Sequence, residues 1–185
     1  MNTRIKYMIG AAASLAIFGV SAGLAKADSA FDGATLGIDG AAAYGSADDL
    51  SGFGYGGGAS VGYGQVLDKT YTGVELRGEL SNHELDDDGA SITKRQSYGG
   101  AVKVGRQVAP DTIVYGLVGY ERGVFEVDGG SDVWANGIRS GLGFEKVLTS
   151  DVSVKTEGSY TRWMSNALDD SPNEFGMRLG LSYRY

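Results

Sequence analysis

The stretch FGMRLGLSYRY, residues 175–185, alternates between two kinds of side chain at every position. One set is aliphatic or aromatic and consists of Phe175, Met177, Leu179, Leu181, Tyr183 and Tyr185. The other set is small or cationic and consists of Gly176, Arg178, Gly180, Ser182 and Arg184. A period of two residues is typical of a β-strand whose two faces meet different surroundings. Because a terminal strand frays unless something holds it, the stretch predicts a sheet in which this strand has partners.

The first 27 residues have the pattern of a cleavable secretory signal peptide. Arg4 and Lys6 supply a positive start, an apolar stretch follows, and Ala25-Lys26-Ala27 offers a small-x-small cleavage site. The alternative is a membrane anchor that stays attached, but the small residues at the exit favour cleavage. We therefore expect one mature, exported domain that comprises residues 28–185.

Composition narrows the class of protein. Removing residues 1–27 takes away three bases and no acid, which leaves 13 bases against 23 acids and lowers the net charge from −7 to −10. Such a surface repels nucleic acid, which needs basic patches. The chain has no Cys, 31 Gly and 11 Tyr, and no mature segment has the roughly 20 apolar residues of a membrane helix. Together these features indicate an all-β fold.

Alternation divides the mature chain into eight segments, at roughly 34–45, 58–67, 70–81, 94–108, 112–125, 133–147, 151–163 and 174–185. Three connections are tight turns, at 68–69, 109–111 and 148–150, whereas those at 46–57, 82–93, 126–132 and 164–173 are longer and polar. Short turns alternating with long loops predict an eight-stranded antiparallel up-and-down transmembrane β-barrel, with both termini on the short-turn, periplasmic side. Closure would pair the last strand with the first and remove both sheet edges.

The charged residues decide which face of the barrel points outward. A soluble lipocalin-type barrel would alternate equally well, with apolar residues inward. The faces opposite the apolar ones carry six acids and six bases, interleaved with Gly and Ser: Asp39, Glu75, Arg77, Glu79, Lys103, Glu121, Arg139, Glu145, Lys155, Glu157, Arg178 and Arg184. On the solvated exterior of so acidic a protein, we would expect acids to outnumber bases. A closed interior must instead pair each charge with one of the opposite sign. We therefore expect an interior ion-pair network and an apolar outer face in lipid.

Aromatic residues gather towards the ends of the predicted strands, as they do at lipid–water boundaries. They are Tyr44, Tyr71, Tyr98, Tyr120, Trp134, Tyr160, Phe175, Tyr183 and Tyr185. This distribution favours a membrane barrel with an aromatic girdle at each rim.

The last strand resembles the closing strand of the OmpA-like and opacity-type outer-membrane barrel family, through Arg178, Gly180, Tyr183 and Tyr185. GVELRGEL at 73–80, VKVGRQVAPDTIVYGLVGY at 102–120 and GLGFEKVLTSDVSVKTEGSY at 141–160 are similar too. The resemblance implies that Gly180, Tyr183 and Tyr185 form a signal for the outer-membrane assembly machinery. It further implies interior charges at Glu75, Lys103, Glu145, Lys155 and Glu157. At the fifth strand the family can have an interior arginine, where this chain has Leu117. Larger members of the family continue into a peptidoglycan-binding domain, which we do not expect here.

These features predict an integral outer-membrane protein with a structural or surface role rather than an enzyme. Eight strands leave an interior that side chains can fill, so the charges favour a static plug, with a narrow porin-like channel as the alternative. A lipid-modifying enzyme is a further alternative, but it needs a nucleophile with a positioned base. The only histidine, His83, lies in an acidic predicted loop without a matching Ser motif, which favours a solvated side chain.

The predicted external loops are acidic. They hold Asp48, Asp49, Glu84, Asp86, Asp87, Asp88, Glu126, Asp128, Asp132, Asp169, Asp170 and Glu174, without one Lys or Arg. Clustered carboxylates suit divalent cations, but the spacing of an EF-hand loop is missing, so a solvated surface is favoured and neither a metal site nor a cofactor is predicted.

Three cations are expected on the lipid face near the external ends of the strands: Lys94, Arg122 and Arg162. Contact with lipid phosphates would suit them, and simple snorkelling to the interface is the alternative. The expected partners are therefore outer-membrane lipid and lipopolysaccharide, and the resemblance adds the assembly machinery. The expected location is the bacterial outer membrane, and a monomer is favoured while the oligomeric state stays open.

Overall fold

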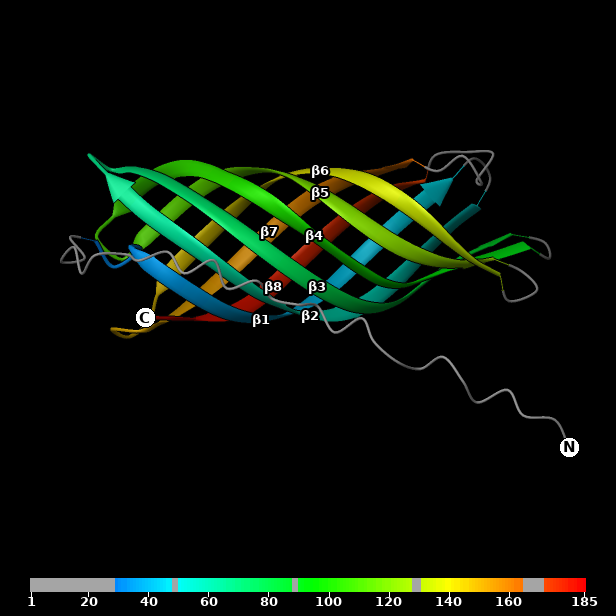
Figure 1. Cartoon of the computed structure of the whole chain (residues 1–185), viewed down its shortest axis with the longest axis horizontal. Coiled ribbons are helices and arrows are strands. Elements are labelled where there is room, and N and C mark those ends of the chain that lie inside the picture. The colour runs from blue at the N-terminus through cyan, green and yellow to red at the C-terminus, as the bar shows by residue number, and fades with distance from the viewer. Residues whose placement is uncertain (1–28, 48–49, 88–89, 128–130, 165–171) are drawn as a thin grey trace, which may run out of the picture.

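The protein is a closed barrel of eight antiparallel strands in a computed structural model, which describes residues 29–47, 50–87, 90–127, 131–164 and 172–185. The strands are β1 (Gly33–Ala47), β2 (Leu50–Leu67), β3 (Thr70–Asp87), β4 (Ala90–Ala109), β5 (Thr112–Val127), β6 (Ser131–Val147), β7 (Val152–Met164) and β8 (Asn173–Arg184). Each strand pairs with the next along the chain (Figure 1). None of the described residues forms a helix long and apolar enough to cross a membrane. The signal peptide expected at residues 1–27 lies outside the described residues.

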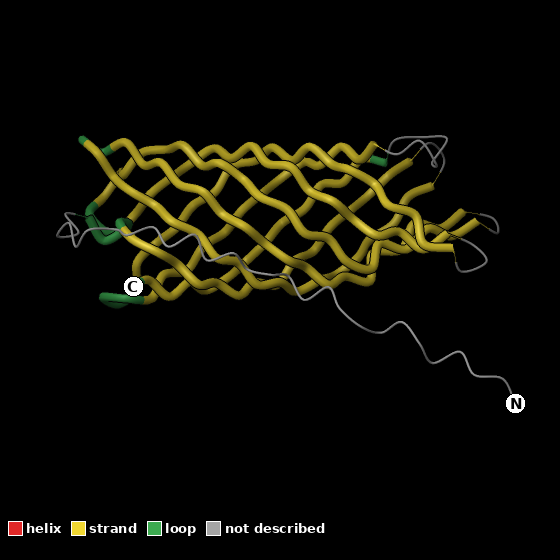
Figure 2. Tube along the Cα trace, viewed as in Figure 1, coloured by secondary structure: helices red, strands yellow, loops and turns green. Residues whose placement is uncertain are grey.

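The last strand is held on both sides, as the opening stretch predicts. β8 pairs with β7 and also with β1, from Thr35 opposite Arg184 to Ser46 opposite Asn173. The strands therefore run around the barrel without an interruption (Figure 2). Because a closed barrel satisfies backbone N–H and C=O groups between neighbouring strands, it suits a solvent that offers no hydrogen bonds.

The two ends of the barrel differ. Three short connections lie at the end that also holds the C-terminus, which we call the turn end, and the opposite end is the loop end (Figure 1). Asp68 and Lys69 both have positive φ, 47° and 69°, which matches the two-residue hairpin turn favoured by strand twist. At the β4–β5 turn, the Thr112 hydroxyl donates to Asp111 at 2.9 Å and lowers the pKa of that carboxyl.

The strands at the loop end are longer than the sequence pattern predicts. β2 begins at Leu50, β3 continues to Asp87 and β4 begins at Ala90, so most of 46–57 and 82–93 is strand rather than loop. Gly, Ser and Asp are weak strand formers, but strand preference depends strongly on pairing partners. The β3–β4 ladder reaches the pair Asp87–Ala90, and this pairing overrides the local preference.

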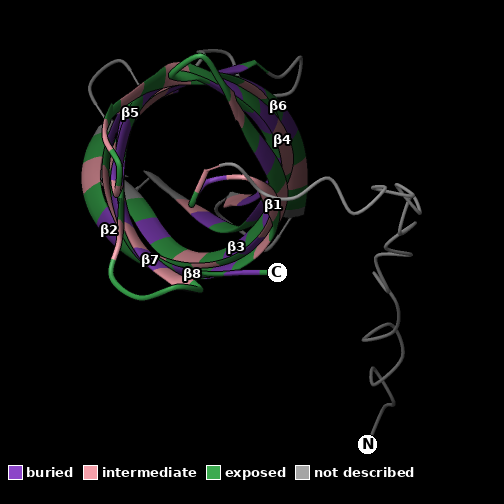
Figure 3. Ribbon diagram, turned by 90° about the vertical axis from the view of Figure 1, so that its left-hand side faces the viewer, coloured by how far each residue is buried: buried purple, intermediate pink, exposed green. Residues whose placement is uncertain are grey.

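Burial shows an inside-out barrel. Exposed and buried residues alternate along each strand (Figure 3). Among the described residues, twenty-nine large hydrophobic side chains are exposed, whereas only ten hydrophobic residues are buried. Contiguous apolar surface on this scale does not occur on soluble monomers, so the lipocalin alternative does not fit.

The aromatic residues on the outer face mark a membrane-sized band. Phe175 on β8 and Tyr185, directly after the end of this strand, are ten residues apart and both exposed, and on β2 the same holds for Phe53 and Tyr63. Ten residues of strand tilted by about 40° span about 25 Å, the height of the apolar band in outer-membrane barrels. The spacing of the aromatics therefore fits the thickness of a bilayer.

Spin labels test which face meets lipid. The chain has no cysteine, so single labels at Leu179→Cys and Ser182→Cys report on one outward and one buried inward position of β8. In vesicles, we expect the label at 179 to collide freely with oxygen but not with a polar nickel chelate. The label at 182 should be immobile and shielded from oxygen, and the reverse pattern would disprove this orientation of the strand.

Candidate functional site

The interior of the barrel contains an equal number of acidic and basic residues. All twelve charges predicted for the interior are buried, and the structure adds the buried pair Lys94 and Glu174. The acids are Asp39, Glu75, Glu79, Glu121, Glu145, Glu157 and Glu174, and the bases are Arg77, Lys94, Lys103, Arg139, Lys155, Arg178 and Arg184. Among the side chains that the structure describes, seven charges of each sign leave no net charge inside the barrel when His83 is neutral.

The centre of the network is built on two shared carboxylates. Glu157, only 1% exposed, accepts from Lys103 Nζ at 2.6 Å and from Arg77 Nη2 at 3.2 Å. Glu75 accepts from Lys103 and Lys155, both at 2.9 Å, and lies 2.9 Å from Arg77 Nη2. These residues come from β3, β4 and β7, so the ion pairs cross the barrel as well as running along its wall.

Towards the loop end, a second group continues the network. Arg178 donates from Nε and Nη2 to Glu79 Oε2, at 3.1 and 2.7 Å. Asp39 lies 3.6 Å from Arg77 and 3.9 Å from Arg178, contacts that are electrostatic rather than hydrogen bonds. Arg139 Nη1 lies 2.9 Å from Glu121.

An apolar cluster closes the turn end of the barrel. Its members are Phe31, Tyr71, Ile113, Tyr115 and Leu117, with Val66 and Val147 packed against them. Phe31 precedes β1, has no exposed surface, and its carbonyl accepts from Arg184 Nη1 at 2.7 Å. The same arginine donates to Glu145 at 3.0 Å, so the plug is tied to the charged network.

Tyr115 joins the apolar cluster to the central ion pairs. Its hydroxyl donates to Glu157 Oε1 at 2.8 Å, and its ring lies 4.8 Å from Lys103 Nζ. The ring rests on the opposite glycine of β6, Gly143, where a side chain would collide with it. Leu117, at the position where the family resemblance implies an interior arginine, faces inward as part of this apolar cluster.

At the loop end, a smaller group of polar side chains surrounds Lys94. Lys94 donates to both oxygens of Glu174, at 2.8 and 2.7 Å, and lies 3.4 Å from Glu79. His83 Nδ1 lies 3.4 Å from Glu174, and its Nε2 lies 3.2 Å from the carbonyl oxygen of Gly52. A second apolar cluster of Phe125, Ala135 and Trp163 lies at this end of the barrel.

The prediction that Lys94 faces lipid is therefore wrong. It rested on unbroken alternation along β4, but the pairing of β4 with β5 shifts between Lys94 and Gln96. Arg95 and Gln96 are both exposed, and Lys94 is turned inward. A β-bulge inserts one residue and so reverses the faces of all residues beyond it.

Two other predictions at this end are corrected with it. His83 was expected to be solvated and Glu174 to belong to an acidic loop, but both are buried and lie against each other. For His83 the cause is the extension of β3 into the segment predicted as a loop. Glu174 lies in β8, at the first residue of the predicted strand, and shares the inward face of Arg178.

Tyr71 was placed among the lipid-facing aromatics, and this is also wrong, because the side chain is buried in the apolar cluster of the turn end. Tyr71 shares the face of Glu75, four residues along the same strand, so strict alternation gives the correct answer. Nearness to a strand end is a weaker signal at this residue than the alternation.

The remaining predicted residues lie on the outer wall or on β8. Arg122 and Arg162 are exposed on the outer face, and Arg122 stacks on Trp134 at 4.6 Å. Tyr183 and Tyr185 are also exposed, and their rings are 4.9 Å apart. Gly180 faces inward against Asp39, where a Cβ would collide with the backbone of β1.

Within the described ranges, no group of three or more His, Cys, Asp or Glu side chains is placed to hold a metal ion. The densest acidic run, at 86–88, lies where side chains are outside the described residues.

The family model "Outer membrane protein beta-barrel domain" matches residues 11–184, nearly the whole chain. The chain belongs to this family of outer-membrane β-barrel proteins. Together with the inside-out burial, the match assigns the protein to the bacterial outer membrane.

Solved structures show the same fold. Neisserial surface protein A is 17% identical and matches with a TM-score of 0.65, over 83% of this chain and 98% of that one. Ail, the attachment invasion locus protein of Yersinia pestis, is 15% identical with a TM-score of 0.51, over 83% and 99% of the two chains. No curated protein matches the sequence. At these identities the likeness shows the fold alone.

Adjacent residues of β4 offer a matched test of the bulge. Lys94→Met leaves Glu174 buried without its main cation, and we expect it to lower the free energy of unfolding by about 3–5 kcal/mol. Arg95→Met alters a side chain that is 63% exposed and pairs only at the surface with Glu126, so we expect a change below about 1 kcal/mol. Urea unfolding of the barrel in detergent micelles measures both, and equal effects would contradict the inward position of Lys94.

Proposed function

We propose that the protein is a closed, ion-paired barrel with a structural or surface role in the outer membrane, rather than a pore or an enzyme. One observation supports this most strongly: the charged interior lies between two apolar clusters, one at each end. In this proposal the barrel is a rigid support, and its loop end is the part that meets the surroundings.

A conducting path would need to cross both apolar clusters. Phe31, Tyr115 and Trp163 are each at most 1% exposed, which leaves no solvent contact at these points. Between them, each cation of the central group contacts a carboxylate, and moving one means breaking a buried pair, which costs several kcal/mol. These contacts support a static plug over the narrow channel.

Enzymatic activity would need an accessible nucleophile with a base. Among the described residues, two serine hydroxyls lie beside a possible base: Ser153 Oγ donates to Glu145 at 2.6 Å, and Ser60 Oγ lies 3.1 Å from Lys155 Nζ. All four side chains are buried in the interior, and Lys155 is also bound to Glu75. His83 is likewise buried, with Glu174 and Gly52 against its ring nitrogens. A pair that no substrate can reach does not support catalysis.

The difference between the two ends of the barrel supports one orientation in the membrane. In this proposal the turn end and both termini are periplasmic after cleavage of residues 1–27, and the acidic loop end faces outward. Gly180, Tyr183 and Tyr185 are then available to the assembly machinery as the strand is presented for insertion. Arg122 and Arg162 lie at the level of lipid phosphates, including those of lipopolysaccharide, around a monomeric barrel.

The names of the structural relatives are consistent with a surface role, since one is a surface protein and the other an attachment protein. Ail has also been solved with the heparin analogue sucrose octasulfate. The acidic loops of this chain do not favour such a polyanion, so that ligand is not carried over.

Planar bilayer recording tests the proposed closure. We expect the wild-type protein, inserted at high copy number, to give no discrete conductance steps where a trimeric porin gives them. Phe31→Gly with Tyr71→Ala removes two of the five members of the turn-end cluster and should still leave the loop end closed. Regular steps from the wild-type barrel would refute the proposal and support the channel.

A further inference from the structure

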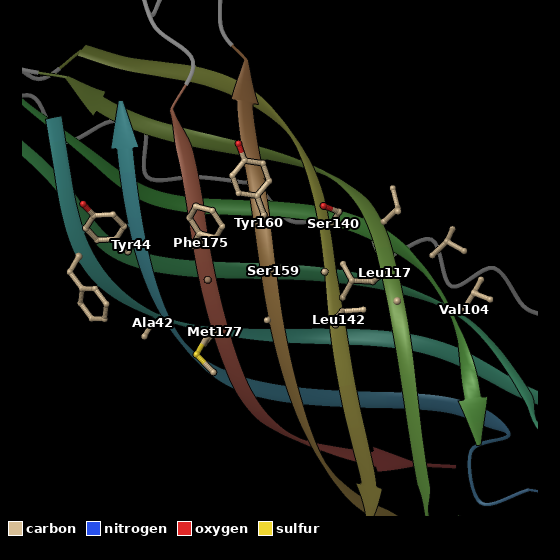
Figure 4. A pocket seen from close by; sticks show the side chains of 17 residues that line it. Ala42, Tyr44, Val104, Leu117, Ser140, Leu142, Ser159, Tyr160, Phe175 and Met177 are labelled. Carbon is tan, nitrogen blue, oxygen red and sulfur yellow. The ribbon is translucent and has the colours of Figure 1, made fainter. Parts of the chain in front are cut away.

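The outer wall of the barrel has a depression that the proposed function does not use. It has a volume of about 1090 Å³, and its lining is almost entirely apolar. Four lining residues on four strands have small side chains or none: Ala42, Gly116, Ser140 and Gly158. Larger apolar side chains, such as Leu142 and Met177, project from the wall around them (Figure 4).

The depression is bordered towards the loop end by aromatic rings. Tyr160 and Phe175 are paired across β7 and β8, with ring centroids 4.8 Å apart, and Tyr44 lies opposite Phe175 on β1 (Figure 4). The Tyr160 hydroxyl donates to Asn173 at 2.6 Å. The ring of Tyr160 therefore lies against the depression, and its hydroxyl lies at the border nearer the loop end. Tyrosine favours this arrangement at a lipid–water boundary.

A cation lies directly beyond this border. Gly158, Tyr160 and Arg162 are successive outward positions of β7, so about 13 Å of strand joins the floor of the depression to Arg162. Arg162 is exposed and, among the described residues, forms no ion pair. A guanidinium can bind a phosphate through two parallel hydrogen bonds.

We propose that the depression binds one acyl chain of a phosphate-bearing lipid whose phosphate is held by Arg162. If the depression stayed empty, the side chains that line it would lose dispersion contacts. An ordered acyl chain fills the depression better than mobile lipid does. The site rests on the proposed membrane placement, which puts Arg162 at the level of the headgroups. Arg122 is not part of it, because that side chain is stacked on Trp134.

Glycines supply a matched pair of variants. A Cβ built at Gly158 or at Gly78 meets nothing within 4 Å, so either position accepts a side chain without a clash. Gly158→Leu fills the depression, whereas Gly78→Leu adds the same side chain on β3, away from it. Arg162→Gln removes the proposed phosphate ligand, and Arg122→Gln removes an outward arginine at a similar level.

The experiment compares lipid retention by the folded mature barrel in micelles, with native mass spectrometry as the readout. The probes are dimyristoylphosphatidylglycerol and dimyristoylglycerol, which has the same chains without phosphate. We expect wild type to retain one phospholipid, Arg162→Gln to weaken retention about tenfold, the effect of one charge-assisted contact, and Gly158→Leu to abolish it. The Gly78→Leu and Arg122→Gln variants should behave as wild type, and dimyristoylglycerol should bind wild type no better than it binds Arg162→Gln.

Equal retention by all variants would show general lipid coverage and overturn the site. Loss in Gly78→Leu or Arg122→Gln as large as in the test variants would overturn it as well. Insertion into vesicles and the gel shift between heated and unheated samples are measured for each protein. Failure of wild type to insert would refute the membrane placement itself, whereas normal insertion with unselective retention refutes only the lipid site.

Discussion

Charge balance inside a closed cylinder is the constraint on which the rest of the structure depends. An isolated ionised group carries a large desolvation cost in an apolar surrounding, and the barrel wall keeps the interior from bulk water along most of its length. Seven acids and seven bases meet this condition because most carboxylates serve two cations, as Glu157 does with Arg77 and Lys103. Such sharing fixes the side chains of several strands at once, which favours one register of the barrel over its alternatives.

Much of this arrangement could be predicted from the sequence. Strict alternation in the last strand predicted its two faces, and the equal number of acids and bases on the inner face predicted a closed interior rather than a solvated surface. The polar stretches at the loop end could not be assigned in this way. Their Gly, Ser and Asp residues indicate loops locally, while the pairing of β3 with β4 makes them strands.

The errors in the candidate site have separate physical causes, and the cause for Lys94 is a bulge in β4. The bulge between Lys94 and Gln96 depends on the pairing register of β4 with β5, and no local sequence pattern predicts it. A balanced interior gives a clue in retrospect, since Lys94 and Glu174 are buried as a pair and preserve neutrality. The plug formed by Phe31 could not be found either, because it depends on the chain before β1 folding under the barrel, with Asp32 accepting from the backbone of Val66 at 2.7 Å.

The most direct test of the account is a double-mutant cycle on Glu157 and Lys103, followed by urea unfolding in micelles. Each single change, Glu157→Gln or Lys103→Met, removes one member of the shared group and leaves one uncompensated charge in the interior, which should cost about 3–5 kcal/mol. The double variant should cost less than the sum of the two, by roughly 1–3 kcal/mol. Additive costs, or single changes that leave stability unaltered, would contradict a barrel whose interior depends on paired charge.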